Sequence, residues 1–388
     1  MTQLRKFSFF LLSTIFVHLS NLPFLCSGST ISSSGSSGSS NRVVGYYTTW
    51  SKRPFSASQA QLLTHVIVAF PTMNSDGSLS FRDGGRRITQ VKQIAASYPS
   101  LKVMFSMGGS GNSQYFSTVA ANPTTLIINI LNIIDKYNLD GVDIDWENPT
   151  TVADKSNYVS LMQQLRSALD QHQVATSRSA EYVLSFAGAS GQRALDSGYD
   201  LTGLLNYVDF VNVRTYAYYG TWNAYTGPRS PLYGAGARDQ RLNVDWTLNY
   251  YACKTGKPSK LNLGIPFYGP YWQNVGGMAG SDPMYRVATA IHGQYAGGTI
   301  AWKDIPSTSA SWHDVAKVPY IYDSANKKYL GFENPASIGY KGQYAAQKNI
   351  GGLMIWALDQ DDDQFSMLKA VAQGASGLQK SDVINYTC

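Results

Sequence analysis

The segment Asp140–Glu147, which reads DGVDIDWE, places four acidic side chains within eight residues. Apolar and acidic residues alternate through most of it: Val142, Asp143, Ile144, Asp145, Trp146 and Glu147. A period of two is typical of a β-strand. On a solvated strand face such acids would be dispensable. If they are buried, closely spaced carboxylates cannot all ionise, so at least one keeps a proton that it can donate. The fold decides between these two interpretations.

The first 28 residues have the pattern of a secretory signal. Arg5 and Lys6 precede an apolar run, Phe7–Val17, and small residues follow as far as Gly28. The run is too short to span a membrane comfortably, and no later segment is long and uncharged enough to do so. We therefore expect residues 1–28 to be removed and the mature protein to be secreted, without a membrane span.

Composition limits the remaining possibilities. The chain has 388 residues, 44% of them hydrophobic and 14% charged, which suits one large core or one core with an inserted module. Residues 29–41 are rich in Ser and Gly and are expected to form a flexible leader. The net charge of +6 comes from scattered basic residues, which argues against a nucleic-acid partner. No histidine shows metal-ligand spacing, so we expect neither a metal nor a cofactor.

The cysteines and one sequon concern the end of the chain. Cys26 would leave with the signal, so Cys253 and Cys388 remain. In an oxidising compartment they could pair and tie down the tail, or stay as free thiols. Asn385 begins a sequon for N-glycosylation, which would place a glycan beside Cys388.

Eight short apolar runs alternate with amphipathic helical patterns. The runs begin at Val43, His65, Lys102, Leu139, Tyr182, Val208, Leu261 and Gly351. Apolar residues recur at helical spacing between them, as in Ile127, Ile130, Leu131 and Ile134, and in Tyr158, Leu161, Leu165 and Ala168. Eight strands separated by helices predict a closed (β/α)8 barrel over residues 42–375, followed by a tail, 376–388.

The interval before the last strand is too long for one helix. About 80 residues separate the runs at Leu261 and Gly351, and a loop of that length without structure of its own would be unusual. Short strand-like patterns with some helix fill the interval. We expect a small α+β module at about 270–334, inserted between strands seven and eight.

A barrel also decides how the acidic strand is used. The inward faces of the strands fill the barrel, and their carboxyl ends form the active face. Acids pointing outward would lie unpaired under helices, at a large cost. We therefore expect Asp143, Asp145 and Glu147 to point inward, with Glu147 at the rim, and we favour the catalytic interpretation.

These residues resemble a known family. DGVDIDWE fits the DxxDxDxE signature of family 18 glycoside hydrolases, the chitinases and chitinase-like proteins, and Ser106–Gly109 fits their SxGG strand. The stretches GYYTTW, GIPFYG and GLMIWALDQDD resemble the first, seventh and eighth strands of animal-type members. The likeness covers about residues 43–371. It implies a (β/α)8 TIM barrel with the α+β insertion.

The resemblance implies hydrolysis of β-1,4-linked N-acetylglucosamine polymers with retention of configuration. Glu147 would protonate the glycosidic oxygen, and the acetamido carbonyl of the substrate would attack the anomeric carbon. Asp145 would hold the acetamido group, and Asp143 would share a proton with Asp145. Asp140 would brace the strand end, and Tyr216 would hydrogen-bond the acetamido oxygen. Glu147 would then act as the base that activates water.

The same resemblance implies a sugar-binding cleft in a monomeric protein that takes chitin or chitooligosaccharides. Trp356 would be its floor. Other residues expected to contact the sugar are Tyr46, Trp50, Phe70, Trp222 and Tyr268. Gly108, Gly109 and Arg214 are expected to shape the site.

Three departures from the family pattern lie near the expected site. The sixth strand commonly reads M-x-Y-D, whereas this chain has Arg214 at the first position and Ala217 at the last. Ala217 lacks the carboxylate that helps to bind sugar, and Pro270 replaces a common arginine after YG on the seventh strand. Arg214 shares the inward face of Tyr216.

The departures leave more than one function open. A guanidinium near the acids would favour their ionised forms and weaken a general acid, whereas the same group paired elsewhere could be harmless. The intact acidic signature favours an enzyme. The alternative is a secreted chitin lectin that uses the same cleft. A barrel storage or inhibitor protein fits less well, because it would not need Glu147.

Overall fold

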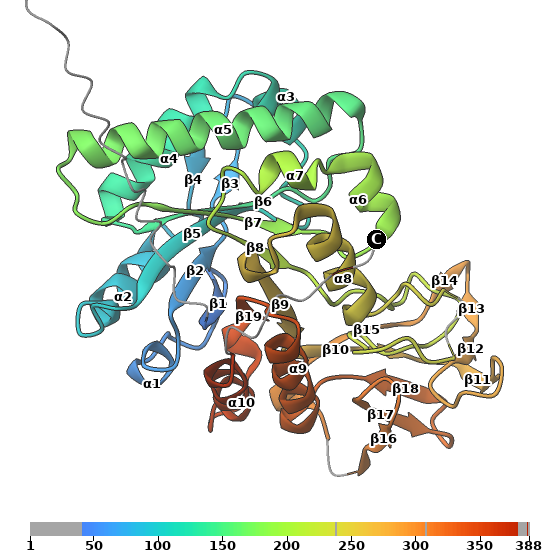
Figure 1. Cartoon of the computed structure of the whole chain (residues 1–388). Coiled ribbons are helices and arrows are strands. Elements are labelled where there is room, and N and C mark those ends of the chain that lie inside the picture. Colours follow the sequence, from blue (N-terminus) through green and yellow to red (C-terminus); the bar gives the residue numbers. More distant parts are fainter. Residues whose placement is uncertain (1–40, 237–238, 307–308, 379–385, 387–388) are drawn as a thin grey trace, which may run out of the picture. The chain divides into compact units, whose positions relative to one another are not determined.

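Eight parallel strands close into a barrel (Figure 1), in the order β1-β19-β9-β8-β7-β6-β5-β2. They are β1 Arg42–Thr48, β2 His65–Ala69, β5 Lys102–Gly108, β6 Gly141–Asp145, β7 Val183–Gly188, β8 Phe210–Val213, β9 Leu261–Pro266 and β19 Gly352–Trp356. Each predicted run overlaps one of these strands, so the predicted TIM barrel is confirmed. This computed structural model describes residues 41–236, 239–306, 309–378 and Tyr386. The predicted signal, nearly all of the leader and most of the tail lie outside the described residues.

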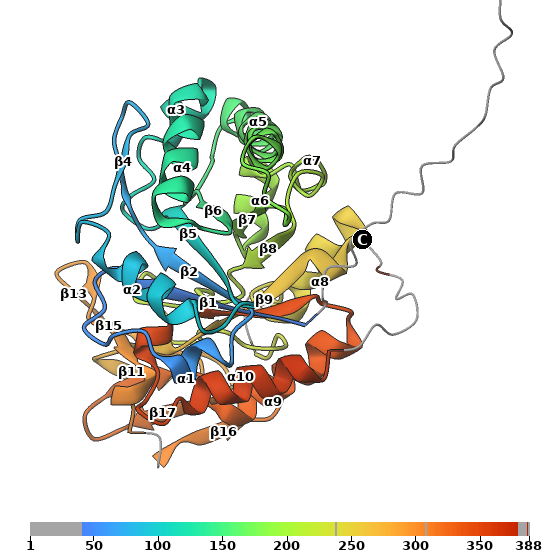
Figure 2. The same cartoon turned by 90° about the vertical axis from the view of Figure 1, so that its left-hand side faces the viewer.

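Helices pack on the outside of the barrel. The α-helices are α1 Ala57–Ala60, α2 Arg86–Ala95, α3 Phe116–Ala121, α4 Thr124–Tyr137, α5 Val152–Ala175, α6 Gln192–Gly198, α7 Leu201–Leu204, α8 Val244–Thr255, α9 Pro335–Gln347 and α10 Ser366–Ser376. Figure 2 shows α3, α4 and α5 grouped beside β5 and β6, with α9 and α10 lying together. Predicted core-facing residues are buried in α4 and α5, except that Leu131 and Ala168 are only partly covered.

The loop after β6 leads into α5 through a capping box. The Thr151 hydroxyl accepts from the Asp154 amide at 3.0 Å, and the Asp154 carboxylate accepts from the Thr151 amide at 3.1 Å. Two amide groups that the first helical turn cannot satisfy are thereby paired. The cap defines where the loop that carries Glu147 ends and α5 begins.

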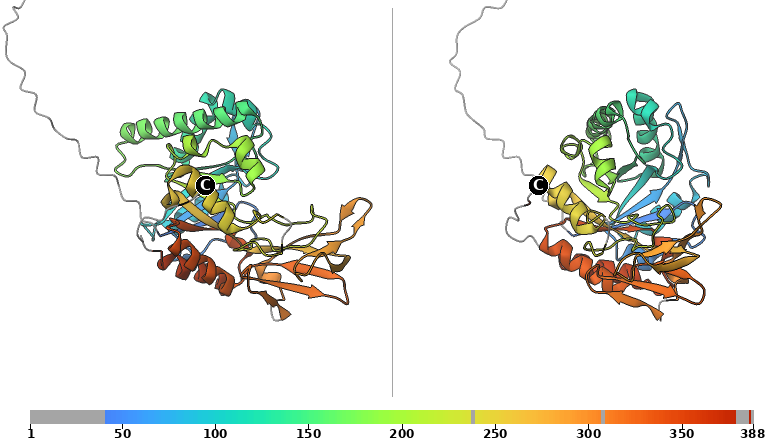
Figure 3. Two further views of the ribbon diagram at one scale, coloured as in Figure 1. Left: turned by 45° about the vertical axis from the view of Figure 1, so that its right-hand side comes forward. Right: turned by 90° about the vertical axis from the view of Figure 1, so that its right-hand side faces the viewer.

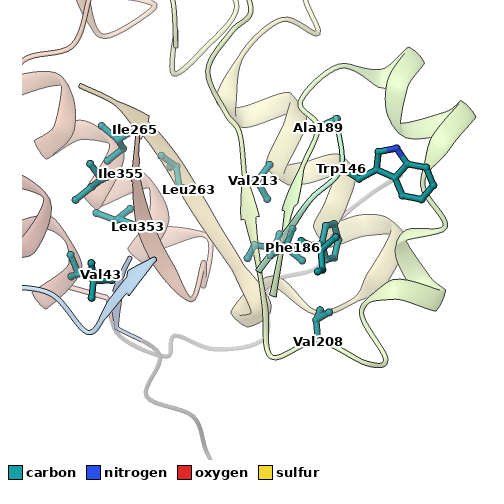
Figure 4. Close-up of a cluster of buried hydrophobic side chains, with 14 of the residues drawn as sticks. Val43, Trp146, Phe186, Ala189, Val208, Val213, Leu263, Ile265, Leu353 and Ile355 are labelled. Atoms are coloured by element: carbon teal, nitrogen blue, oxygen red, sulfur yellow. The ribbon is translucent and has the colours of Figure 1, made fainter. Parts of the chain in front are cut away.

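The strands separate two apolar clusters. The outer one lies between the barrel and its helices, and Figure 4 shows part of it, including Trp146 and Phe186. The inner one fills the barrel with residues such as Ile67, Met104 and Met354. Because neighbours in a strand point to opposite faces, strands such as β1, β2, β5 and β19 contribute to both clusters, whereas β6 turns acids inward.

A second sheet lies between β9 and α9 in sequence. Its antiparallel order is β15-β10-β18-β17-β16, and Figure 3 shows these strands from two further sides. The strands are β10 Tyr268–Trp272, β15 Gly297–Ala301, β16 Ser311–His313, β17 Val318–Asp323 and β18 Lys328–Gly331. Three two-stranded ladders accompany the two sheets: β3 Thr72–Met73 with β4 Leu79–Ser80, β11 Val275–Met278 with β12 Arg286–Ala288, and β13 Ala290–Ile291 with β14 Gln294–Tyr295.

The helical part expected in this module is small. A 3-10 turn, Trp302–Asp304, supplies helix within its described residues. Strands β13 and β14 form a short hairpin in the same module. Gly293, with a φ of 80°, supplies the left-handed conformation that this two-residue turn requires.

Candidate active site

The acids of β6 point into the barrel and rise toward its carboxyl end. Asp143 is fully buried, Asp145 is 4% exposed, and the Glu147 side chain is 31% exposed. Val142 and Ile144 face the outer cluster. The inward orientation follows from the alternation of the strand, and it places three carboxylates at increasing exposure along one line.

Asp143 is held by four donors from four other strands. The hydroxyls of Tyr46 and Ser106 donate to one carboxylate oxygen, at 2.8 and 2.7 Å. The Ser185 hydroxyl and the Asn212 side-chain amide donate to the other oxygen, at 2.6 and 3.2 Å. Burial raises the pKa of Asp143, and these hydrogen bonds to its charged form oppose the rise.

The polar chain continues toward the amino end of the barrel. Asn262 donates to Asn212 Oδ1 at 2.9 Å, and Arg42 Nε donates to Asn262 Oδ1 at 2.9 Å. Arg42 Nη2 also donates to the Ser259 carbonyl at 2.7 Å. The buried amides are thereby satisfied, as a polar group inside a core must be.

Arg214 contacts both acids nearest the rim. Its Nη1 donates to Asp145 Oδ1 at 2.8 Å and also pairs with Glu147 Oε1, while Nη2 donates to Asn148 Oδ1 at 3.1 Å. Asp145 is thus held by the guanidinium rather than by Asp143. The predicted position of Arg214 beside the acids is what the structure shows.

Asp145 remains able to hold a proton at neutral pH. Burial raises its pKa to about 8, the Arg214 charge opposes the rise, and the charges of Glu147 and Asp143 add to it. The free-energy cost of burying a charged Asp145 near Asp143 is larger than the stabilisation that the Arg214 guanidinium provides. Burial therefore favours the neutral form of Asp145, beside the cation of Arg214.

Two glycines allow β5 to approach β6 closely. Gly108 and Gly109 have φ values of 103° and 81°, and the Gly109 amide donates to the Asp145 carbonyl at 2.7 Å. A Cβ on Gly108 would lie 2.2 Å from the same carbonyl oxygen, and one on Gly109 would lie 2.4 Å from the Phe70 ring. Larger residues would push the strand end of Asp145 away from the site.

Tyr216 and Arg214 are positioned through the residue between them. The Thr215 hydroxyl accepts from the Gly264 amide and donates to the Gly264 carbonyl, each at 2.8 Å. The Thr215 carbonyl accepts from Ser230 Oγ at 2.5 Å. These bonds lock the carboxyl end of β8 against β9, and Tyr216 reaches the cleft from that end.

A buried ion pair supports Ser230 from behind. Lys341 Nζ donates to the Ser230 carbonyl and hydroxyl oxygens at 2.7 and 2.8 Å and pairs with Glu333 at 2.7 Å. Neither side chain of the pair is exposed. Ser337 donates to the other Glu333 oxygen at 2.7 Å. A pair so fully buried needs all these partners to offset its desolvation.

The acids open into a cleft of about 530 Å³. Its aromatic lining consists of Trp50, Phe70, Tyr216, Trp222, Tyr268 and Trp356. Trp356 stacks on Phe70 with centroids 5.7 Å apart, and Trp50 follows Phe70 at 6.2 Å. A wall of rings beside carboxylates suits a ligand with apolar faces and many hydroxyls, such as a sugar chain.

A larger hollow, about 830 Å³, lies along α8. Among its described lining residues Asp245 is the one carboxylate, and Cys253 and Tyr386 also border it. It lacks the paired acids of the cleft, so the cleft is the better candidate for chemistry despite its smaller volume.

Two expected site residues lie elsewhere. Tyr46 is 2% exposed, its ring centroid lies 5.3 Å from that of Trp356, and it does not line the cleft, so the expected contact with the sugar is not met. Its side chain points inward from β1, and its hydroxyl donates to Asp143 instead. Asp140 precedes β6 at the opposite end of the strand, where it pairs with Arg178 at 2.6 Å and accepts from the Val103 amide. It can brace the strand but does not line the cleft.

The departures from the family pattern are also visible. Ala217 lines the cleft with a φ of 70°, a left-handed conformation that is costly for a residue with a Cβ. Pro270 is buried in β10, opposite Thr299 of β15. Neither position provides a charge to the cleft.

Several polar residues of the site were not singled out from the sequence. Ser185 and Asn212 occupy inward positions within apolar runs, and that parity was the available signal. Asn148 and Arg229 lie on loops, where no periodicity indicates which way a side chain points.

The remaining expectations concern the cysteines, a metal site and a membrane span. Cys253 is disulfide-bonded, but its expected partner Cys388 lies outside the described residues, as does Asn385. Among the described residues no cluster of His, Cys, Asp and Glu is suited to a metal ion. No described helix has the length and apolar character needed to cross a membrane.

Comparison with known proteins gives a consistent set of relatives. A profile of the family described as glycosyl hydrolases family 18 matches residues 42–361. Chitinase A1 of Niallia circulans is 31% identical over 319 residues, which cover 75% of this chain and 45% of that protein. The chain thus spans less than half the length of this relative.

Solved structures agree with the fold. The Group IV chitinase of Ostrinia furnacalis in complex with allosamidin has a TM-score of 0.76 at 26% identity, over 87% of this chain and 100% of the other. Human YKL-39, described as a pseudo-chitinase with retained chitooligosaccharide binding, has a TM-score of 0.75 at 22% identity, over 87% of this chain and 100% of its own. The second likeness concerns the fold alone.

The raised pKa of Asp145 predicts a specific pH dependence of stability. Between about pH 4 and pH 8 the folded protein keeps a proton that the unfolded chain has released, so the free energy of unfolding falls as pH rises. The slope cannot exceed about 1.4 kcal/mol per pH unit for one group. Asp145→Asn should remove this slope, so that the variant gains stability relative to wild type from pH 5 to pH 7 in urea unfolding. Exposed Asp170→Asn is the control, and parallel curves for Asp145→Asn and wild type would contradict the assignment.

Proposed function

The chain belongs to glycosyl hydrolases family 18, and on that premise we propose that it is a chitinase that hydrolyses β-1,4-linked N-acetylglucosamine polymers with retention of configuration. The observation that carries the proposal is the line of inward acids ending at an aromatic cleft. Asp145 and Glu147 border that cleft together with Tyr216 and Trp356. An acid pair beside a platform for a sugar face is what glycosidic cleavage requires.

The proposed reaction needs no nucleophile from the protein. Glu147 donates a proton to the glycosidic oxygen, and the leaving sugar departs with it. The acetamido carbonyl oxygen at C2 of the same sugar bonds to its anomeric carbon as the bond to the leaving oxygen breaks, and a cyclic oxazolinium forms. Glu147 then takes a proton from water, whose oxygen attacks the anomeric carbon, opens the ring and restores the acetamide.

The residues around Glu147 would stabilise the charge that develops. Asp145 would accept from the acetamido N–H and, once it has lost its proton, would balance the charge of the oxazolinium, while the Tyr216 hydroxyl would donate to the acetamido oxygen. Asp143, with its four hydrogen-bond donors, would keep its negative charge beneath Asp145 and so favour the cation above. The pattern of residues 1–28 further supports secretion, as extracellular cleavage of a polymer would require.

A second candidate, a chitooligosaccharide-binding protein without turnover, is favoured by one observation. Arg214 contacts both Asp145 and Glu147, and a cation there favours the ionised forms of the acids. An acid that is already ionised cannot donate. Substrate would have to draw Arg214 away from Glu147, or the proton of Asp145 would have to reach it.

Glu147→Gln separates the two candidates. The amide cannot donate a proton, so hydrolysis of a chromogenic chitooligosaccharide should fall by at least about 100-fold while binding persists. Wild-type products followed by NMR should appear first as the β-anomer. A chitinase is contradicted if fresh wild-type protein releases no product, or if the variant keeps most of the wild-type turnover.

Arg214→Met tests the role of the guanidinium. Without the cation Asp145 keeps its proton to higher pH, so the falling alkaline limb of the pH–rate profile should move upward by about one pH unit. Arg178→Met is the matched control, because it breaks an ion pair of similar burial at the other end of β6. An unchanged limb in an Arg214→Met protein that unfolding measurements show to be stable would contradict charge tuning by Arg214.

A further inference from the structure

Arg229 is a buried cation at the cleft whose charge is not balanced by the described part of the chain. It lies between β8 and α8, borders the cleft and is 7% exposed. The ion pairs found among the described residues involve other arginines, and none contains Arg229. Arginines that are nearly fully buried are normally paired with an acid.

Neutral groups hold the Arg229 side chain in place. Nη1 donates to the Tyr219 carbonyl at 3.1 Å, and Nη2 donates to the Tyr268 hydroxyl at 2.6 Å. The guanidinium carbon lies 4.9 Å from the centroid of the Tyr268 ring and 5.3 Å from that of Trp222. Its Nε has no hydrogen-bond partner among the described residues. The rings offset part of the desolvation cost but leave the positive charge in the cleft.

The backbone next to Arg229 is anchored as well. Ser230 donates to the Thr215 carbonyl and accepts from Lys341, which is fixed by its ion pair with Glu333. The arginine therefore cannot move far to find an acid. A cation fixed in this way is preorganised for a ligand, because its side chain loses little conformational entropy when the ligand binds.

The other charges of the cleft do not compensate for Arg229. Arg214 is already shared between Asp145 and Glu147. Ala217, which also borders the cleft, has no carboxylate. Because burial raises the pKa of Asp145 to about 8, the acid pair does not carry its full negative charge at neutral pH. The cleft thus has an excess of positive charge on the side of Trp222 and Tyr268.

We propose that Arg229 binds an oxyanion, a carboxylate or a sulfate, carried by a sugar of an N-acetylglucosamine oligosaccharide in the cleft. The inference rests on the proposed function, since it assumes that the cleft takes such oligosaccharides. Each terminal nitrogen of Arg229 has a second N–H beyond its bonds to Tyr219 and Tyr268, and a guanidinium binds oxyanions through charge-assisted hydrogen bonds. The ring of Trp222, 59% exposed, offers a surface for the apolar face of the same sugar.

Calorimetric titration tests whether Arg229 binds an oxyanion. The full-length Glu147→Gln protein is used, because this substitution prevents hydrolysis of the ligand during the titration. Three ligands are compared: neutral chitotetraose, chitotetraose with one C6 carboxylate, and chitotetraose with one 6-O-sulfate. We expect at least one acidic ligand to bind about tenfold more tightly than the neutral one at low ionic strength. The ligand that gains identifies the oxyanion, and added salt should reduce the gain.

Two variants assign the preference to Arg229. Arg229→Gln keeps a polar side chain without charge and should bind neutral and acidic ligands equally, whereas Arg229→Lys should keep part of the preference. Arg86→Gln, which removes an exposed charge from the start of α2, should behave as the parent does. Ala217→Asp, which adds a carboxylate to the cleft and leaves Arg229 intact, should also weaken the preference if Arg229→Gln fails to fold.

The outcomes separate this inference from the function on which it rests. If the neutral ligand binds and the acidic ligands gain nothing, or if Arg229→Gln keeps the preference, the inference is wrong and the proposed function stands. If none of the three ligands binds, the proposed function fails and the inference fails with it.

Discussion

The structure depends on the burial of carboxylates inside a closed barrel. A strand that points acids inward must satisfy them there, because an unpaired charge in a core is far too costly. Asp143 meets this requirement with hydroxyl and amide donors from β1, β5, β7 and β8, so its burial constrains the residue types on four other strands. Asp145, with fewer partners, meets it by keeping a proton. Catalysis would use the proton that Asp145 keeps because it is buried.

Arg214 changes the net charge of the site and the protonation equilibria of its acids. It brings a positive charge to the two carboxylates nearest the rim and ties Asp145 to Glu147 through one guanidinium. The proposed general acid would therefore start from an ion pair, and the energy of substrate binding would have to disrupt it. The unbalanced charge of Arg229 lies in the same cleft, so both arginines bear on which ligand the site accepts.

Much of the fold and part of the site could be predicted from the sequence, for physical reasons. Alternation within β6 determines which face each acid takes, and the carboxyl end of a barrel strand determines where Glu147 emerges. The family resemblance placed Tyr46 at the sugar, but a resemblance in sequence cannot tell how deep a side chain lies, and Tyr46 is 2% exposed, with its ring 5.3 Å from that of Trp356. Arg229 could not be predicted, because a loop has no period and its contacts with Trp222 and Tyr268 come from distant segments.

The central claim is that burial leaves Asp145 protonated at neutral pH even though Arg214 touches it. A carbon-13 NMR titration of the side-chain carboxyl groups measures this directly, with the Asp145 signal assigned by its absence in an Asp145→Asn spectrum. We predict a transition with a pKa of about 8, so that Asp145 is protonated at pH 6. A transition near pH 4, the ordinary range of an aspartate, would show that Arg214 keeps Asp145 ionised and would contradict the account.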